Sequence, residues 1–119
     1  MYVNDKMVLQ LVALLKKFGI KKVVVSPGSR HNKLINSLET DGSFKLYLVV
    51  DERSAAFFAL GLIQECGEPV AVTCSSGTAC MNYGSAIVEA FYQRLPLIVL
   101  SSDRVPELLN QCEDQMYDQ

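Results

Sequence analysis

The sequence lacks a run of apolar residues long enough to cross a lipid bilayer, which takes about 20 residues in a helix. Its 119 residues carry 11 basic and 13 acidic side chains, so it also lacks the positive charge that favours nucleic acids or anionic membranes. The start, MYVNDKMVLQ, does not have the basic-then-apolar order of a secretory signal. We therefore expect a cytoplasmic protein with no nucleic-acid partner and no membrane partner.

The spacing of a metal site is absent as well. The four cysteines are Cys66, Cys74, Cys80 and Cys112; none form a CxxC pair, and His31 is the only histidine. Neither a zinc site nor a triad built around that histidine is easily assembled. Three of the cysteines have apolar or small neighbours, where a reduced cysteine acts as a small hydrophobe. We interpret His31 as a partly exposed helix residue.

Half of the residues are apolar, and strand-like and helix-like patterns alternate along the chain. The patterns predict helices over about Asp5–Phe18, Ser29–Asp41, Glu52–Cys66 and Thr78–Tyr92, with one or two helical turns over Pro106–Asn110. They predict strands over Lys22–Val25, Lys45–Val50, Pro69–Cys74 and Leu97–Leu100. Strands separated by helices of this length need right-handed crossovers, and continuous apolar strands indicate that both faces are covered. The sequence predicts an α/β domain, a doubly wound and mostly parallel sheet with helices on both faces.

The chain stops at Asp118-Gln119, after a polar segment that opens no new element. We interpret this as a cut through a longer polypeptide, so that residues 1–119 form its single N-terminal domain. A complete small protein is the alternative.

Ligands of doubly wound domains gather where the strands end, and the first such turn is Ser26–Arg30. A glycine after proline allows a tight turn, and Ser29 and Arg30 follow at a helix N-terminus, which suits a carboxylate or a phosphate. The GxxxxGK[ST] spacing of a phosphate-binding P-loop is missing. A plain turn with a solvated arginine is the alternative.

The second turn places Glu52 in the first turn of a helix, directly after an apolar strand and with Asp51 as its N-cap. The helix dipole favours the ionised acid, whereas a dry cleft would raise its pKa and suit it to general acid–base work. A surface glutamate that matches the helix dipole is the alternative.

Two further turns complete the rim, by which we mean the edge of the sheet at which the strands end. Ser75–Thr78 carries little side-chain bulk, so a flat ligand ring could approach its backbone; an ordinary capped helix start is equally compatible with it. In the fourth turn, Arg104 could clamp an acidic substrate or pair with Asp103.

The order of these turns resembles the pyrimidine-binding domain of thiamine-diphosphate enzymes. Within that superfamily, SPGSR, DERSAAFFALG, PVAVTCSSGTACMN and PLIVLSSDRVPEL resemble the 2-succinyl-5-enolpyruvyl-6-hydroxy-3-cyclohexene-1-carboxylate (SEPHCHC) synthase family of menaquinone biosynthesis. The acetolactate-synthase and decarboxylase branch typically has Gly-Pro-Gly in the third turn, where this chain has Ser76-Gly77-Thr78. The chain departs from the family at Ser26, often alanine, and at His31, usually a small polar residue.

The resemblance implies thiamine diphosphate as cofactor and Glu52 as the catalytic carboxyl that hydrogen-bonds a ring nitrogen of its aminopyrimidine. It places Gly28 and Thr78 close to the pyrimidine. The implied reaction decarboxylates 2-oxoglutarate and adds the resulting carbanion to isochorismate, with the cofactor as electron sink.

The resemblance also implies substrate contacts at Ser29, Arg30, Arg104 and Gln115, which match family positions that touch substrate. Both implied substrates carry carboxylates, and arginine binds a carboxylate through two parallel hydrogen bonds.

The family holds Mg²⁺ and the diphosphate with a GDG-to-Asn motif in a later domain, usually from the partner subunit of a dimer. No such motif occurs in these residues. We therefore expect a homodimeric or homotetrameric full-length enzyme, and no activity from this chain alone.

Two other functions stay open from the sequence. One is a different thiamine-diphosphate lyase or decarboxylase. The other is a non-catalytic doubly wound binding module, although a receiver domain would need an acidic pair after the first strand, where this chain has Val24-Val25-Ser26-Pro27.

Overall fold

A computed structural model describes residues 4–103 of the chain. Its sheet contains four strands in the order β2-β1-β3-β4, and all neighbouring pairs are parallel. The strands are β1 (Lys22–Val25), β2 (Lys45–Leu48), β3 (Val70–Cys74) and β4 (Leu97–Ser101). The two central strands, β1 and β3, pair in a register that sets Val25 beside Thr73, so their carboxyl ends meet at one edge of the sheet.

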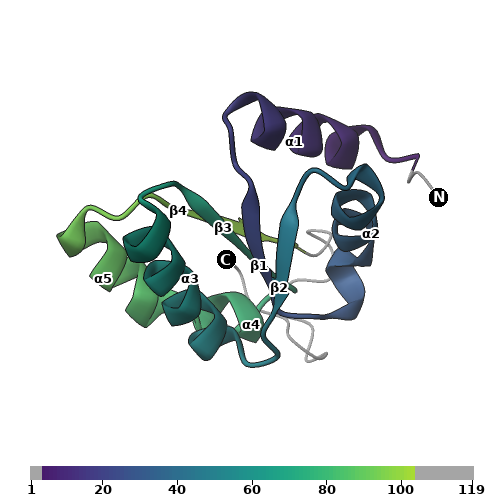
Figure 1. The fold of residues 1–119 in the computed structure, drawn as a ribbon. Coiled ribbons are helices and arrows are strands. Elements are labelled where there is room, and N and C mark those ends of the chain that lie inside the picture. The colour runs from purple at the N-terminus through teal and green to yellow at the C-terminus, as the bar shows by residue number, and fades with distance from the viewer. Residues whose placement is uncertain (1–3, 104–119) are drawn as a thin grey trace.

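Helices cover both faces of this sheet (Figure 1). They are α1 (Lys6–Lys17), the short 3-10 helix η1 (Ser29–His31), α2 (Asn32–Asp41), α3 (Glu52–Cys66), α4 (Thr78–Met81) and α5 (Gly84–Gln93). Among the described residues, no helix is long and apolar enough to cross a membrane. The doubly wound parallel fold predicted from the sequence is confirmed.

The core divides into two layers because successive side chains of a strand point to opposite faces. Val23 and Val25 of β1 pack with Leu15 of α1 and Leu38 of α2. Val24, between them, packs on the other face in the cluster that α3 and α5 supply. All three valines are at most 3% exposed, as expected for a strand covered on both sides.

Local signals fix the two ends of α3, the helix that carries Glu52. The Asp51 carboxylate accepts a hydrogen bond of 2.8 Å from the backbone N–H of Ser54, which satisfies one of the free donors of the first turn. At the other end Gly67 has φ 67° and its N–H donates to the Ile63 carbonyl, a left-handed cap that glycine adopts without strain. The predicted bounds of this helix are confirmed.

The helix predicted over 78–92 is divided into α4 and α5, so this prediction is wrong in its middle. The backbone N–H of Tyr83 donates to the Cys80 carbonyl at 3.0 Å, a three-residue turn that is tighter than the α-helical one. The Asn82 side-chain amide donates to the Thr78 carbonyl at 2.9 Å. The break turns the Tyr83 ring into the core, where it is 0% exposed.

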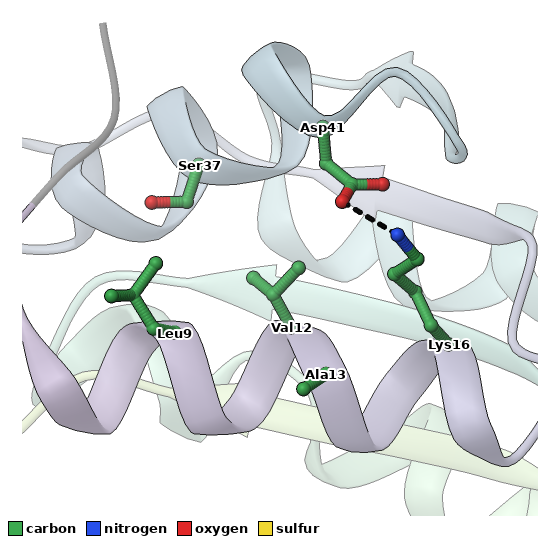
Figure 2. A pocket seen from close by; sticks show the side chains of 6 residues that line it. All are labelled: Leu9, Val12, Ala13, Lys16, Ser37 and Asp41. Carbon is green, nitrogen blue, oxygen red and sulfur yellow. Dashed lines mark hydrogen bonds and ion pairs between the residues drawn. The ribbon is translucent and has the colours of Figure 1, made fainter.

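A shallow pocket of about 310 Å³ lies between α1 and α2 (Figure 2). An ion pair of 2.9 Å between Lys16 and Asp41 joins the last turns of the two helices across it. No residue of the turns that follow the strands lines this pocket, so it is separate from the rim at which ligands were expected.

Candidate functional site

Ser26 joins the turns that follow β1, β2 and β3. Its backbone N–H donates to the Thr73 carbonyl of β3 at 3.0 Å. Its hydroxyl donates to the Val49 carbonyl, just beyond β2, at 2.8 Å. The side chain is fully buried. With one hydrogen bond to β3 and one to the segment after β2, Ser26 holds the first turn against the other two.

Gly28 brings the first turn into direct contact with the third. A Cβ placed on Gly28 would lie 2.7 Å from the Cβ of Ser75 and 3.4 Å from Cε1 of the His31 ring. The φ of Gly28 is −169°, an extended conformation open to any residue. Glycine is thus needed here for space, because any side chain would overlap Ser75.

The third turn needs glycine for a different reason. Gly77 has φ 64° and ψ −121°, a region that residues with a Cβ rarely enter. The two serines before it, Ser75 and Ser76, are 4% and 1% exposed. Thr78 then opens α4 at the surface. A turn of small residues therefore lies against Gly28.

Glu52 opens α3 at the carboxyl end of β2 and is half-buried. Burial lowers the pKa of His31, next to the first turn, and raises that of Cys74 at the end of β3; the negative charge of Glu52 opposes the first shift and adds to the second, so the carboxylate lies within electrostatic reach of both. Glu52 is therefore partly shielded from solvent, in the first turn of its helix.

Burial dominates the protonation of the groups around Glu52. It raises the pKa of Cys74 to about 12 and that of Tyr83 even further, with the charges of Cys74 and Glu52 adding to the effect. It lowers the pKa of His31, which the Ser26 backbone and the Glu52 charge only partly oppose. All three side chains are therefore uncharged near neutral pH.

Buried polar side chains without a hydrogen-bond partner are concentrated in this region. Within residues 4–103, seven buried side-chain atoms lack a partner, and all but Ser37 Oγ belong to the rim. They are Nδ1 and Nε2 of His31, Oγ1 of Thr73, Oγ of Ser75, Oγ of Ser76 and the hydroxyl of Tyr83. An unpaired buried group costs about 1–3 kcal/mol, so this cluster needs hydrogen-bond partners, which ordered water or a bound molecule can supply.

A cavity of about 700 Å³ adjoins the first turn. Ser29, Arg30 and His31 form one side of it, and Ser101 and Ser102 at the end of β4 form another. Arg30 is exposed and makes no ion pair with any of residues 4–103. Its guanidinium can therefore bind an anion that enters the cavity.

The structure brings most of the candidate residues to one rim. Gly28 and Glu52 lie around the cluster of unpaired groups, Thr78 follows the third turn, and Ser29 with Arg30 faces the adjoining cavity. Arg104 and Gln115, together with Cys112 and the helical turns predicted over 106–110, lie outside the described residues.

Two residues of the rim were missed or misjudged. The prediction that His31 is partly exposed is wrong, because η1 turns its ring inward and leaves it 2% exposed. Tyr83 was not singled out. The signal that could have found it is Gly84, a residue that weakens a helix interior and here begins α5 after the break.

Comparison with known proteins agrees with this geometry. Residues 6–119 match the family described as "Thiamine pyrophosphate enzyme, N-terminal TPP binding domain". The chain is 49% identical over 97% of its length to a 2-succinyl-5-enolpyruvyl-6-hydroxy-3-cyclohexene-1-carboxylate synthase of Phocaeicola vulgatus, of which it covers 21%. It is also 49% identical, over 92% of its length, to the enzyme of that name from Geobacillus kaustophilus, of which it covers 19%. The chain spans about a fifth of the length of these relatives. It belongs to the family of N-terminal domains that bind thiamine pyrophosphate, the same compound as thiamine diphosphate, in thiamine pyrophosphate enzymes.

Proposed function

We propose that residues 1–119 form the N-terminal, pyrimidine-recognising domain of a thiamine-diphosphate-dependent SEPHCHC synthase of menaquinone biosynthesis. The observation that carries the proposal is the position of Glu52, half-buried and within electrostatic reach of the first and third turns. Relatives with that printed name, 49% identical to the chain, support the choice among thiamine-diphosphate enzymes.

The residues of the rim fit an aminopyrimidine ring. The turn at Ser75–Gly77 is narrow and carries only small side chains, so a flat ring can lie against its backbone. Several unpaired hydroxyl groups there can donate or accept a hydrogen bond. This matches an aminopyrimidine, whose amino nitrogen donates and whose ring nitrogens accept. Glu52 adds an acid that can share a proton with a ring nitrogen.

Each residue has a defined task in this proposal. The Glu52 carboxyl holds a proton in a hydrogen bond to the pyrimidine nitrogen. Gly28 and Thr78 border the ring, and glycine at position 28 lets the first turn pack directly against Ser75. Bound thiamine diphosphate supplies the electron sink for decarboxylation.

The cavity beside the first turn suits the carboxylates of the two proposed substrates, 2-oxoglutarate and isochorismate. Arg30 offers a planar pair of donors, and Ser29 lies next to it in the wall. Substrate contacts at Arg104 and Gln115 stay predictions from the resemblance.

We propose a homodimer or homotetramer for the full-length enzyme, with Mg²⁺ and the diphosphate held by a later domain. An apolar surface on α3 and α5 supports assembly, since such patches mark protein interfaces. Its members, all at least 42% exposed, are Phe57, Phe58, Val88, Phe91 and Tyr92. A cytoplasmic location stays a prediction from the sequence.

The decisive experiment is an assay of the full-length enzyme with isochorismate, 2-oxoglutarate, thiamine diphosphate and Mg²⁺. We expect isochorismate to disappear with release of carbon dioxide and a product of the expected mass, and we expect residues 1–119 alone to be inactive. Turnover with pyruvate as donor but no use of isochorismate would instead indicate another thiamine-diphosphate lyase. Failure to bind thiamine diphosphate at all would leave a non-catalytic binding module.

A further inference from the structure

His31 lies on the rim between the proposed position of the pyrimidine and the cavity that contains Arg30. Its ring is 2% exposed and its Cε1 lies 3.4 Å from the position of a Cβ on Gly28, on the side where the pyrimidine is proposed to lie. The same residue contributes to the wall of the 700 Å³ cavity that contains Arg30. One imidazole thus separates the proposed cofactor side from the proposed substrate side.

Neither nitrogen of this ring makes a hydrogen bond of good geometry within residues 4–103, although the Ser26 backbone lies near enough to raise the pKa of the ring against the effect of burial. Because burial lowers the pKa of His31, the ring is neutral near pH 7 and presents one N–H donor and one acceptor. Leaving a buried donor unpaired costs about 1–3 kcal/mol. A ligand that accepts this hydrogen bond therefore binds more tightly than it would to a donor that is already hydrogen-bonded to water.

The charges around His31 indicate what kind of partner fits. From its own segment come Arg30, which has no ion pair among the described residues, and Lys33, whose ammonium is 3.3 Å from the Asp5 carboxylate of the α1 cap. The end of β4 contributes Asp103 to the cavity, and α3 contributes the charge of Glu52. Among residues 4–103, Arg30 is the cation of this segment without an ion pair, so the ligand that it would bind is an anion.

We propose that His31 is a substrate-positioning residue: its ring N–H donates to the carboxylate that Arg30 binds in the cavity beside the first turn. This inference rests on the proposed function and names a residue at which the chain departs from its family's usual small polar side chain. It adds a second, directional contact to the arginine, which fixes the carboxylate relative to Gly28 and the proposed ring.

The contact has a pH dependence with a definite sign. A bound carboxylate adds negative charge beside the ring and raises the pKa of His31 above its value in the free enzyme. The complex therefore binds more protons than the free enzyme between those two pKa values. Carboxylate affinity is highest at low pH and falls as pH rises through the pKa of the complex, provided that the protonation of Glu52, Asp5 and Asp103 does not change on binding.

The test uses the full-length enzyme loaded with thiamine diphosphate and Mg²⁺. Calorimetric titration with succinate, a non-reacting dicarboxylate, in buffers of different ionisation enthalpy measures proton uptake on binding. At a pH between the pKa values of His31 in the free enzyme and in the complex, the wild type should take up part of a proton, and His31→Asn should take up none. His31→Leu should weaken succinate binding, and raise the KM of at least one substrate, by roughly 10- to 100-fold, the value of one hydrogen bond to a charged group.

Controls separate this inference from the proposed function. Ser37→Ala removes an unpaired buried hydroxyl from α2, outside the cavity, and should change neither quantity. His31→Asn keeps a donor and should recover part of the affinity that His31→Leu loses. Circular dichroism checks that both variants fold. If His31→Leu does not fold, the comparison of His31→Asn with the wild type decides the test. Unchanged proton uptake and unchanged KM in the variants of an active enzyme would overturn the inference. An inactive wild type that still takes up protons with succinate would overturn only the proposed function.

Discussion

Ser75 leaves no room for a side chain at Gly28. A Cβ on Gly28 would lie 2.7 Å from the Cβ of Ser75, closer than two carbon atoms approach without displacement. The contact follows from the sheet order, because β1 and β3 are neighbours and their registers end together. The turns after these strands therefore pack as one unit, and Glu52 lies within electrostatic reach of it.

Gly28→Ala should separate the first turn from the third. Because the φ of −169° is open to alanine, the expected destabilisation of about 1–3 kcal/mol comes from overlap and not from backbone strain. Urea unfolding of the variant measures it. Ser75→Gly in the same chain removes the clashing Cβ and should restore most of the lost stability.

A matched control is Gly61→Ala in α3. Nothing lies within 4 Å of a Cβ at that position, and alanine in a helix interior is favoured over glycine by about 1 kcal/mol. This variant should be unchanged or slightly stabilised. Equal effects at the two glycines would show that the contact with Ser75 does not limit position 28.

Asp51→Ala should destabilise the start of α3 without touching the core. The Asp51 carboxylate accepts from the Ser54 backbone, and hydrogen bonds from Ser54 hold its pKa below the usual range. Loss of such a cap typically costs about 1 kcal/mol, measured here as a lower midpoint in urea. Asp51→Asn keeps the acceptor and should stay close to the wild type; a similar loss in both variants would assign the effect to charge.

The sequence predicted those parts of the fold that local chemistry decides. The strand Lys22–Val25 and the helix Glu52–Cys66 have the predicted bounds, because a β-branched run, an aspartate cap and a glycine stop act on their own segments. The inward turn of His31 could not be predicted in this way. Its neighbours Arg30 and Asn32 are polar and exposed, and only the three-dimensional contact with Gly28 shows which way the ring points.

The same limit applies to Tyr83. Apolar spacing continues through the break between α4 and α5, so periodicity alone predicts one helix. The ring of Tyr83 fills the core beneath the third turn instead, and its hydroxyl joins the unpaired groups of the rim. Tertiary burial outweighs the local helical pattern at this position.

Cys74 should resist alkylation although it lies beside the proposed site. Burial raises its pKa to about 12, so at pH 8 roughly one thiol in 10⁴ is ionised, and only the thiolate reacts. Mass spectrometry after iodoacetamide treatment should show Cys66, which is half-buried, modified well before Cys74. Treatment in denaturant should abolish the difference; equal rates in the folded chain would contradict the buried position.

Glu52→Gln tests the centre of the proposal in the full-length enzyme. The amide keeps the size of the side chain and the hydrogen-bonding reach, but it cannot hold or release a proton, so turnover should fall by at least about 10²-fold, in the range of general acid–base catalysis. The fold should persist, because Asp51 and not Glu52 caps the helix; circular dichroism and the urea midpoint check this. Glu65→Gln, an exposed change near the other end of the same helix, controls for the loss of one negative charge. If Glu52→Gln turns over isochorismate as fast as Glu65→Gln does, the carboxyl at position 52 has no part in the chemistry, whatever its position in the rim.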